Sequence, residues 1–308
     1  MNVYLDTNLW NALCDQSVSP TDLLASMASK NCNLVLSYQV VYEMAKCFRD
    51  SGTRGAERGR TLFTYLREFV QRDMRCVTEI LEVLAAEMWA LRSGKSIDPF
   101  LSPQGHNALQ ANVEMLANGT FDERAQAFVE ERAMLAPRIR RGPIRQLELR
   151  PDVKQRLKGV SDQQLGAWLR SEALSDQGVA LLADHVRRQF SEASPEDASE
   201  WALGLLGSSS CRLSAALVRA DLYYNWRCAH RGSNPKDLFD DMYHVLNAIY
   251  CDVYATKEPG HAQYAGLLLT QHTKVAIYEN QTPVGTWIVG LTVRPTTLRR
   301  EEDGNEGR

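Results

Sequence analysis

The chain has no paired cysteines, no long apolar run and no large excess of charge, and each absence excludes a class of protein. Its seven cysteines include no Cys-x-x-Cys pair, which argues against a disulfide framework and against a structural zinc site. No apolar run of about eighteen residues is present to span a bilayer, and no basic segment leads into an apolar one at the start. We therefore expect a cytoplasmic protein without a membrane partner.

Motifs for several common chemistries are also missing. The sequence contains no glycine-rich phosphate loop, no Gly-x-Ser-x-Gly elbow and no His-Glu-x-x-His helix. The formal net charge of the 308 residues is −3, so any nucleic acid must be held by local basic patches. One such patch contains Arg138, Arg140, Arg141 and Arg145, whose planar guanidinium groups suit phosphates. A solvated helix end and a protein-binding patch are equally consistent with this cluster.

Strand and helix patterns alternate at both ends of the chain, which predicts an α/β fold. Apolar runs typical of strands are Val3–Leu5, Asn33–Ser37, Cys251–Thr256, Lys274–Tyr278 and Thr286–Val293. Helical spacing of apolar residues follows the first two runs, and Pro259–Leu269 fits a helix between the third and the fourth. Such alternation is typical of a parallel sheet flanked by crossover helices.

The middle of the chain, from Gly52 to Gly232, has a helical pattern and no convincing strand. Apolar residues between Leu62 and Leu91 fit one long amphipathic helix or two joined near Arg72, and helix-capping patterns occur at 120–123, 161–164 and 194–197. We therefore predict one α/β unit from residues 1–50 and 233–298, a large all-α insertion at 51–232, and a disordered tail at 299–308. The insertion offers a surface for a protein partner or for self-association.

Acidic residues flank the apolar stripe of a helix predicted from Asn234 to about Tyr250. At roughly 100° per residue, Asp241 lies beside this stripe and Asp240 lies on the opposite, solvent side. Asp237 stands four residues before Asp241, and the two carboxylates would repel each other unless a cation lies between them. A divalent ion would remove this repulsion, although Asp237 is also well placed simply to cap the helix.

Three further acids occupy positions from which they could reach the same place. Asp6 follows the first strand, at the edge of a parallel sheet where ligands gather, although Asp is also a common helix cap. Glu43 flanks an apolar helix face, with Lys46 and Arg49 as alternative partners. Glu258 follows the strand that ends near Thr256, and the alternative for it is a solvated turn residue.

Polar neighbours could support these acids. Asn8 could bond to its loop or orient Asp6, and Thr256 could contact an acid at the same edge. His244 could orient an acidic ligand or contact phosphate, and a hydrogen-bonded structural histidine is the alternative.

Taken in order, four segments resemble the PIN-domain nucleases: Val3–Asn8, Ser37–Glu43, Asp241–His244 and Cys251–Glu258. The resemblance covers about a third of the chain. It implies a parallel sheet of about five strands whose acids bind Mg²⁺ or Mn²⁺ and cleave RNA, or in some members structured DNA. Residue by residue, it places the four catalytic and metal-binding acids at Asp6, Glu43, Asp241 and Glu258. The last is usually Asp in this family, so Glu258 would coordinate directly or through water.

The resemblance implies a metal-dependent nuclease, most readily a ribonuclease, that leaves a 5′-phosphate and a 3′-hydroxyl. Hard cations with oxygen ligands suit Mg²⁺ or Mn²⁺. The long helical insertion is absent from the compact toxin members of the family, so RNA processing and defence against phage are open beside a toxin role. The alternative from another class is a non-catalytic RNA-binding or adaptor protein on the same scaffold.

Overall fold

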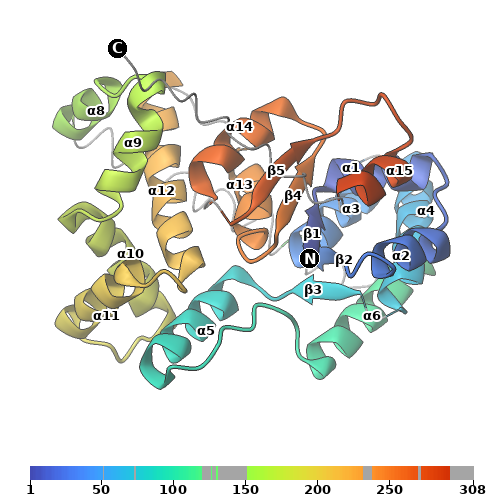
Figure 1. Cartoon of the computed structure of the whole chain (residues 1–308), viewed down its shortest axis with the longest axis horizontal. Helices are drawn as coiled ribbons and strands as arrows, with labels where there is room; N and C mark the ends of the chain where they lie inside the picture. The colour runs from blue at the N-terminus through green and yellow to red at the C-terminus, as the bar shows by residue number, and fades with distance from the viewer. Residues whose placement is uncertain are drawn as a thin grey trace, which may run out of the picture.

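The sheet at the centre of the molecule has five parallel strands. The computed structural model describes residues 1–50, 52–72, 74–119, 126, 130, 151–231, 238–269 and 272–291. The strands are β1 (Asn2–Leu5), β2 (Asn33–Ser37), β3 (Arg75–Val77), β4 (Val253–Thr256) and β5 (Lys274–Ile277). Their order across the sheet is β3-β2-β1-β4-β5 (Figure 1). The predicted α/β class, with a parallel sheet flanked by helices, is confirmed.

The strand order creates a switch point between β1 and β4. From β1 the chain moves outward to β2 and β3, and then returns to the other side of β1 for β4 and β5. Tyr4 of β1 accordingly pairs with Val35 of β2 on one side and with Tyr254 of β4 on the other. Open α/β sheets bind their ligands beyond the carboxyl ends of the strands at such a switch point. The residues that directly follow β1 and β4 therefore occupy the place where a site is expected.

Helices cover both sides of this sheet. On one side α15 (Val284–Leu291) contacts both α1 (Thr7–Asp15) and α2 (Pro20–Ala28). On the other side α13 (Leu238–Asn247) and α14 (Pro259–Leu268) lie between the sheet and α12 (Arg212–Arg231), as Figure 1 shows. The helix α3 (Tyr38–Asp50) follows β2 and contacts both α1 and α13. Because α1, α3, α13 and α14 all meet near the switch point, side chains from distant segments can converge there.

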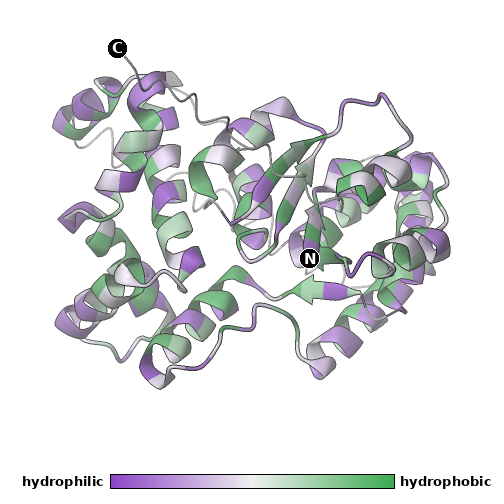
Figure 2. Ribbon diagram, in the orientation of Figure 1, coloured by the Kyte–Doolittle hydropathy of each residue, from purple (hydrophilic) through white to green (hydrophobic). Residues whose placement is uncertain are grey.

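The remaining helices extend the molecule on both sides of the sheet. These are α4 (Gly52–Val70), α5 (Ile80–Ser93), α6 (Pro103–Ala117), α8 (Pro151–Lys158), α9 (Asp162–Glu172), α10 (Asp176–Gln189) and α11 (Pro195–Gly207). The predicted caps at Ser161 and Ser194 are confirmed at α9 and α11, and Figure 2 shows hydrophobic and hydrophilic residues alternating along the helices. The capping pattern predicted at 120–123 lies outside the described residues.

Two sequence predictions about the fold are wrong. The stretch 51–232 is not all-α, because β3 pairs with β2 and forms an edge of the sheet. Of the two alternatives given for Leu62 to Leu91, the structure has two helices, α4 and α5, and this strand lies between them. The strand predicted at 286–293 is instead the helix α15 as far as Leu291. The sheet thus draws on the segment that was assigned to the insertion.

Among the described helices, none is by itself both long and apolar enough to cross a membrane. Only when Pro195–Gly207 and Arg212–His230 are taken together, across a bend of 104°, do length and composition meet that requirement.

Candidate metal-binding site at the sheet switch point

Asp6 lies directly beyond β1 and uses its two carboxylate oxygens differently. Oδ1 accepts a hydrogen bond from the Leu9 amide at 3.0 Å, which caps α1. Oδ2 accepts from the Thr256 hydroxyl at the end of β4, and the Asp6 amide donates to the Ala255 carbonyl at 3.1 Å. The side chain is 1% exposed. Capping and site roles, posed as alternatives from the sequence, are therefore compatible, because Oδ2 remains directed into the site.

Glu258 lies two residues beyond β4, and neighbours hold both its carboxylate and its amide. Asn8 donates to Oε1 from the first turn of α1, and the Glu258 amide donates to the Thr256 hydroxyl at 3.0 Å. Asn8 thus orients Glu258 rather than Asp6, which corrects one of the roles considered for it. The Glu258 side chain is half exposed, so this acid lies at the mouth of the site. It is not simply a solvated turn residue.

His261, on the first turn of α14, lies among three of the predicted acids. Its Nε2 is 3.1 Å from Asp241 Oδ1 and 3.0 Å from Glu258 Oε2, and its Nδ1 is 3.7 Å from Asp6 Oδ2. Burial disfavours the charged ring, but the contacts with Asp241 and Asp6 outweigh it and raise the pKa of His261 to about 10. One imidazolium therefore joins carboxylates from residues 6, 241 and 258.

Sequence reasoning missed His261. The available signal is its spacing from Glu258, because residues three apart share one face of a helix. Asp241 is half-buried on α13, as predicted, with the Tyr264 ring packed against His261 at 5.5 Å between centroids. Asp240 does not point to solvent as predicted, since its carboxylate accepts a hydrogen bond from Lys46 at 2.9 Å and is 16% exposed.

Glu43 lies on α3 and pairs with a second histidine. His244 Nε2 is 3.0 Å from Glu43 Oε2, and Gln39 donates to Glu43 Oε1 at 3.0 Å. Burial alone would raise the pKa of Glu43, but the charge and hydrogen bond of His244 lower it to about 2. Lys46, one of the two alternative partners considered for Glu43, forms its ion pair with Asp240 instead.

A buried chain of hydrogen bonds fixes the His244 ring. Tyr4 Oη lies 2.8 Å from Nδ1 of His244 and 2.7 Å from the hydroxyl of Ser37, and the Thr7 hydroxyl lies 3.3 Å from Nε2. Burial opposes charging of His244, but the adjacent Glu43 carboxylate raises its pKa above the ordinary value. His244 therefore orients an acid, which is one of the two roles considered for it, and it is also a hydrogen-bonded core residue.

The two histidine centres belong to one site. Thr7, which follows Asp6 directly, contacts His244, and Asp6 and His261 both influence the charge of the His244 ring. Asp6, Glu43, Asp241 and Glu258 thus gather at the switch point. The predicted residues Asp237, Arg138, Arg140, Arg141 and Arg145 lie outside the described part of the chain.

These residues fit a hard cation in their chemistry. Four carboxylates are oxygen donors of the kind that Mg²⁺ and Mn²⁺ prefer, and gathered anions require positive charge between them. Within the described residues, however, no three or more His, Cys, Asp or Glu side chains are arranged to hold a metal ion. The acids instead surround the rings of His244 and His261.

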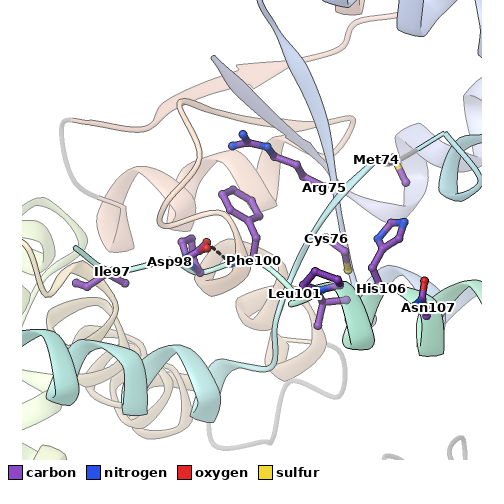
Figure 3. Close-up of a pocket in the computed structure, with 11 residues that line it drawn as sticks. Met74, Arg75, Cys76, Ile97, Asp98, Phe100, Leu101, His106 and Asn107 are labelled. Atoms are coloured by element: carbon purple, nitrogen blue, oxygen red, sulfur yellow. Dashed lines mark hydrogen bonds between the residues drawn. The ribbon is translucent and has the colours of Figure 1, made fainter. Parts of the chain in front are cut away.

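A separate hollow of about 580 Å³ opens beside the edge strand β3 (Figure 3), and none of the four acids lines it. The guanidinium of Arg75 stacks over the Phe100 ring at 5.1 Å, and His106 Nε2 donates to the Val70 carbonyl at 3.2 Å. Asp98, the acidic residue in its lining, accepts a hydrogen bond from the Phe100 amide at 3.1 Å. This hollow has no group of carboxylates for metal chemistry.

Comparison with known proteins adds no relative. No protein-family model, no curated protein and no solved structure matches the chain. Fold and site together define its class as an open α/β protein of five parallel strands with acidic side chains at the switch point of the sheet.

Proposed function

We propose that the protein is a divalent-metal-dependent nuclease of the PIN-like kind, with RNA as its favoured substrate. The observation that carries this proposal is the meeting of Asp6, Asp241 and Glu258 around a single imidazole. Asp6 is more than 230 residues away in sequence from both Asp241 and Glu258. A structural role for any one of these acids does not require the other two. Converging carboxylates at a switch point are what a cation site needs.

Asp6, Asp241, Glu258 and Glu43 are the residues that would hold Mg²⁺ or Mn²⁺. The bound ion would activate water for attack on a phosphodiester and neutralise charge on the leaving oxygen. The chain's own residues keep the acids in place for this: Thr256 and the Leu9 amide fix Asp6, and Asn8 fixes Glu258. His244 and Gln39 fix one oxygen each of Glu43. Such supporting contacts orient ligands and affect metal affinity.

We assign binding of the substrate's phosphates to the positive charges of Arg138, Arg140, Arg141 and Arg145. RNA is favoured over DNA by the resemblance alone. The alternative is an RNA-binding or adaptor protein without catalysis, possible for any scaffold of this kind because fold does not determine activity. The two functions differ in whether a divalent ion produces cleavage.

The experiment compares three proteins on mixed RNA and on single-stranded DNA, with Mg²⁺, with Mn²⁺ and with chelator. The variant Asp6→Asn removes charge from the site but keeps a residue that caps helices well. Asp15→Asn is the matched control, because Asp15 lies on the same helix but pairs with Arg58 at the surface. Each variant is checked for unchanged folding by thermal unfolding.

We expect metal-dependent cleavage by the native chain and by Asp15→Asn. Loss of a supporting contact alone lowers metal affinity or activity by about 10–100-fold. Asp6→Asn removes the charge of a ligand itself, so we expect it to lower the cleavage rate by at least about 100-fold. Fragments should carry a 5′-phosphate. Equal cleavage by Asp6→Asn would overturn the assignment, and RNA binding without cleavage by the native chain would favour the adaptor alternative.

A further inference from the structure

The position of His261 is unusual for a residue of a cation site. A single nitrogen, Nε2, contacts the carboxylates of Asp241 on α13 and of Glu258 just before α14, and Nδ1 faces a third carboxylate, that of Asp6. Through Nε2 the ring thus donates to oxygens that would hold a divalent ion. An oxygen that accepts from the ring cannot at the same time present the same lone pair to a metal.

Gathered carboxylates need a positive or donating group between them, because like charges in a partly buried place repel one another. Here the group is His261, which is 7% exposed. The ring and an external cation therefore satisfy the same requirement with the same oxygens. This makes them alternatives for one place rather than partners in it.

We propose that His261 is a built-in competitor for the divalent ion, and that its ring must leave Asp241 and Glu258 before the ion can bind. The inference rests on the proposed function, since it assumes that these acids hold a cation. It assigns His261 the role of setting the affinity of the site, so that the site stays neutralised when free divalent ion is scarce.

The surroundings of the ring permit this movement. Nδ1 is buried but has no hydrogen-bond partner, so the ring is held chiefly through Nε2. Gly260, the residue before His261, is exposed, and a side-chain carbon added there would meet no atom within 4 Å. On the inner side the Tyr264 ring, at 5.5 Å between centroids, limits movement toward α12. A side-chain rotation can therefore release the acids without a change in the sheet.

Calorimetric titration with Mn²⁺ tests the competition. The proteins are the native chain, His261→Ala, and the control His185→Ala. His185 is matched because it lies on α10 and pairs with one carboxylate, Asp221 of α12 at 2.9 Å, which is not one of the four acids. In the native chain Mn²⁺ must first break a charge-assisted hydrogen bond of His261, and this cost lowers its apparent affinity for the ion by about tenfold or more. We therefore expect Mn²⁺ to bind His261→Ala about tenfold more tightly than the native chain, and His185→Ala to match the native chain.

A second measurement needs no variant. Histidine side-chain NMR signals of the native chain are followed during titration with Mg²⁺, which causes no paramagnetic broadening. We expect the His261 signals to move to those of a solvent-exposed ring as the site fills, while the His244 signals keep their hydrogen-bonded positions.

Opposite results separate the two proposals. Unchanged or weaker Mn²⁺ binding by His261→Ala, or a His261 ring that keeps its contacts at saturation, would overturn the competitor role and leave the nuclease proposal intact. If neither the native chain nor His261→Ala binds Mn²⁺, the proposed function fails, and the competitor role fails with it.

Discussion

Two histidines lie among the acids of this protein, and they differ in how firmly they are held. His244 is 1% exposed, and both of its ring nitrogens have partners, Tyr4 on one side and Glu43 with Thr7 on the other. His261 is 7% exposed and contacts the half-exposed Glu258, and its Nδ1 has no hydrogen-bond partner. The same side chain thus forms a fixed support in one place and a releasable contact in the other.

This difference divides the acids into two kinds. Glu43 is tied to a core histidine whose chain of hydrogen bonds reaches Ser37 at the end of β2. Asp6, Asp241 and Glu258 share a histidine that can turn away. Substitutions at the two histidines should therefore act on different quantities, the first on folding stability and the second on cation affinity.

The largest effect is expected from His244→Leu. The substitution leaves the Glu43 carboxylate largely buried without its partner, and breaking a buried pair from one side costs about 3 kcal/mol or more. Urea unfolding measures this as a loss of unfolding free energy. A loss below about 1 kcal/mol would show that His244 is not the support described here.

Tyr4→Phe should have an intermediate effect. It removes the hydroxyl that joins Ser37 to His244 but keeps the ring that packs against Tyr254 at 6.0 Å. Loss of one partner of buried hydrogen bonds costs about 1–3 kcal/mol. Chemical unfolding of Tyr4→Phe, Ser37→Ala and the double variant tests this chain of hydrogen bonds, since coupled residues give non-additive losses of unfolding free energy. Strictly additive losses in the double variant would show that Tyr4 and Ser37 are not linked by this chain of hydrogen bonds.

His261→Ala should lower stability less than either, by about 1 kcal/mol, because two of its carboxylate partners are partly exposed and such pairs contribute little. Thermal unfolding in the presence of chelator measures this loss. Added Mn²⁺ should then raise the melting temperature of His261→Ala more than that of the native chain, since a tighter ligand stabilises more. An equal rise in both would contradict the contrast between the two histidines.

The last prediction concerns the dependence of stability on pH. The pKa of His261 is raised from about 6.5 in the unfolded chain to about 10 in the folded one. Its charge therefore stabilises the fold fully below pH 6.5, and this contribution is lost as the pH rises through about 10. The difference in unfolding free energy between the native chain and His261→Gln should shrink over that range. His244 is present in both proteins, and because its pKa is raised chiefly by Glu43, most of its contribution cancels. A difference that stays constant with pH would contradict the charged state of the ring.

The sequence predicted the parts of the fold that depend on local pattern. Asp6 directly follows one short apolar run and Thr256 ends another, and their meeting follows from the rule that parallel strands end at one edge. The strand β3 has three residues, too few for a pattern, and it exists because β2 lies beside it. No local signal reports such pairing.

The sequence failed in the opposite way at α15, where tertiary contacts override the local preference for a strand. Its sequence is rich in strand-forming residues, yet its first amide donates to Gln16 at 2.9 Å, and a side-chain carbon at Gly285 would lie 2.9 Å from Val18. Packing against α1 and α2 thus selects a helix. His261 was missed for a related reason, because its importance lies in acids that only the fold brings near it.

The central claim, that the acids at the switch point hold a divalent ion, is tested most directly by anomalous X-ray scattering from crystals soaked in Mn²⁺. We predict one strong peak within coordination reach of Asp6, Asp241 and Glu258, with the His261 ring turned away from them. An empty site at saturating Mn²⁺, with the ring still between the carboxylates, would contradict it.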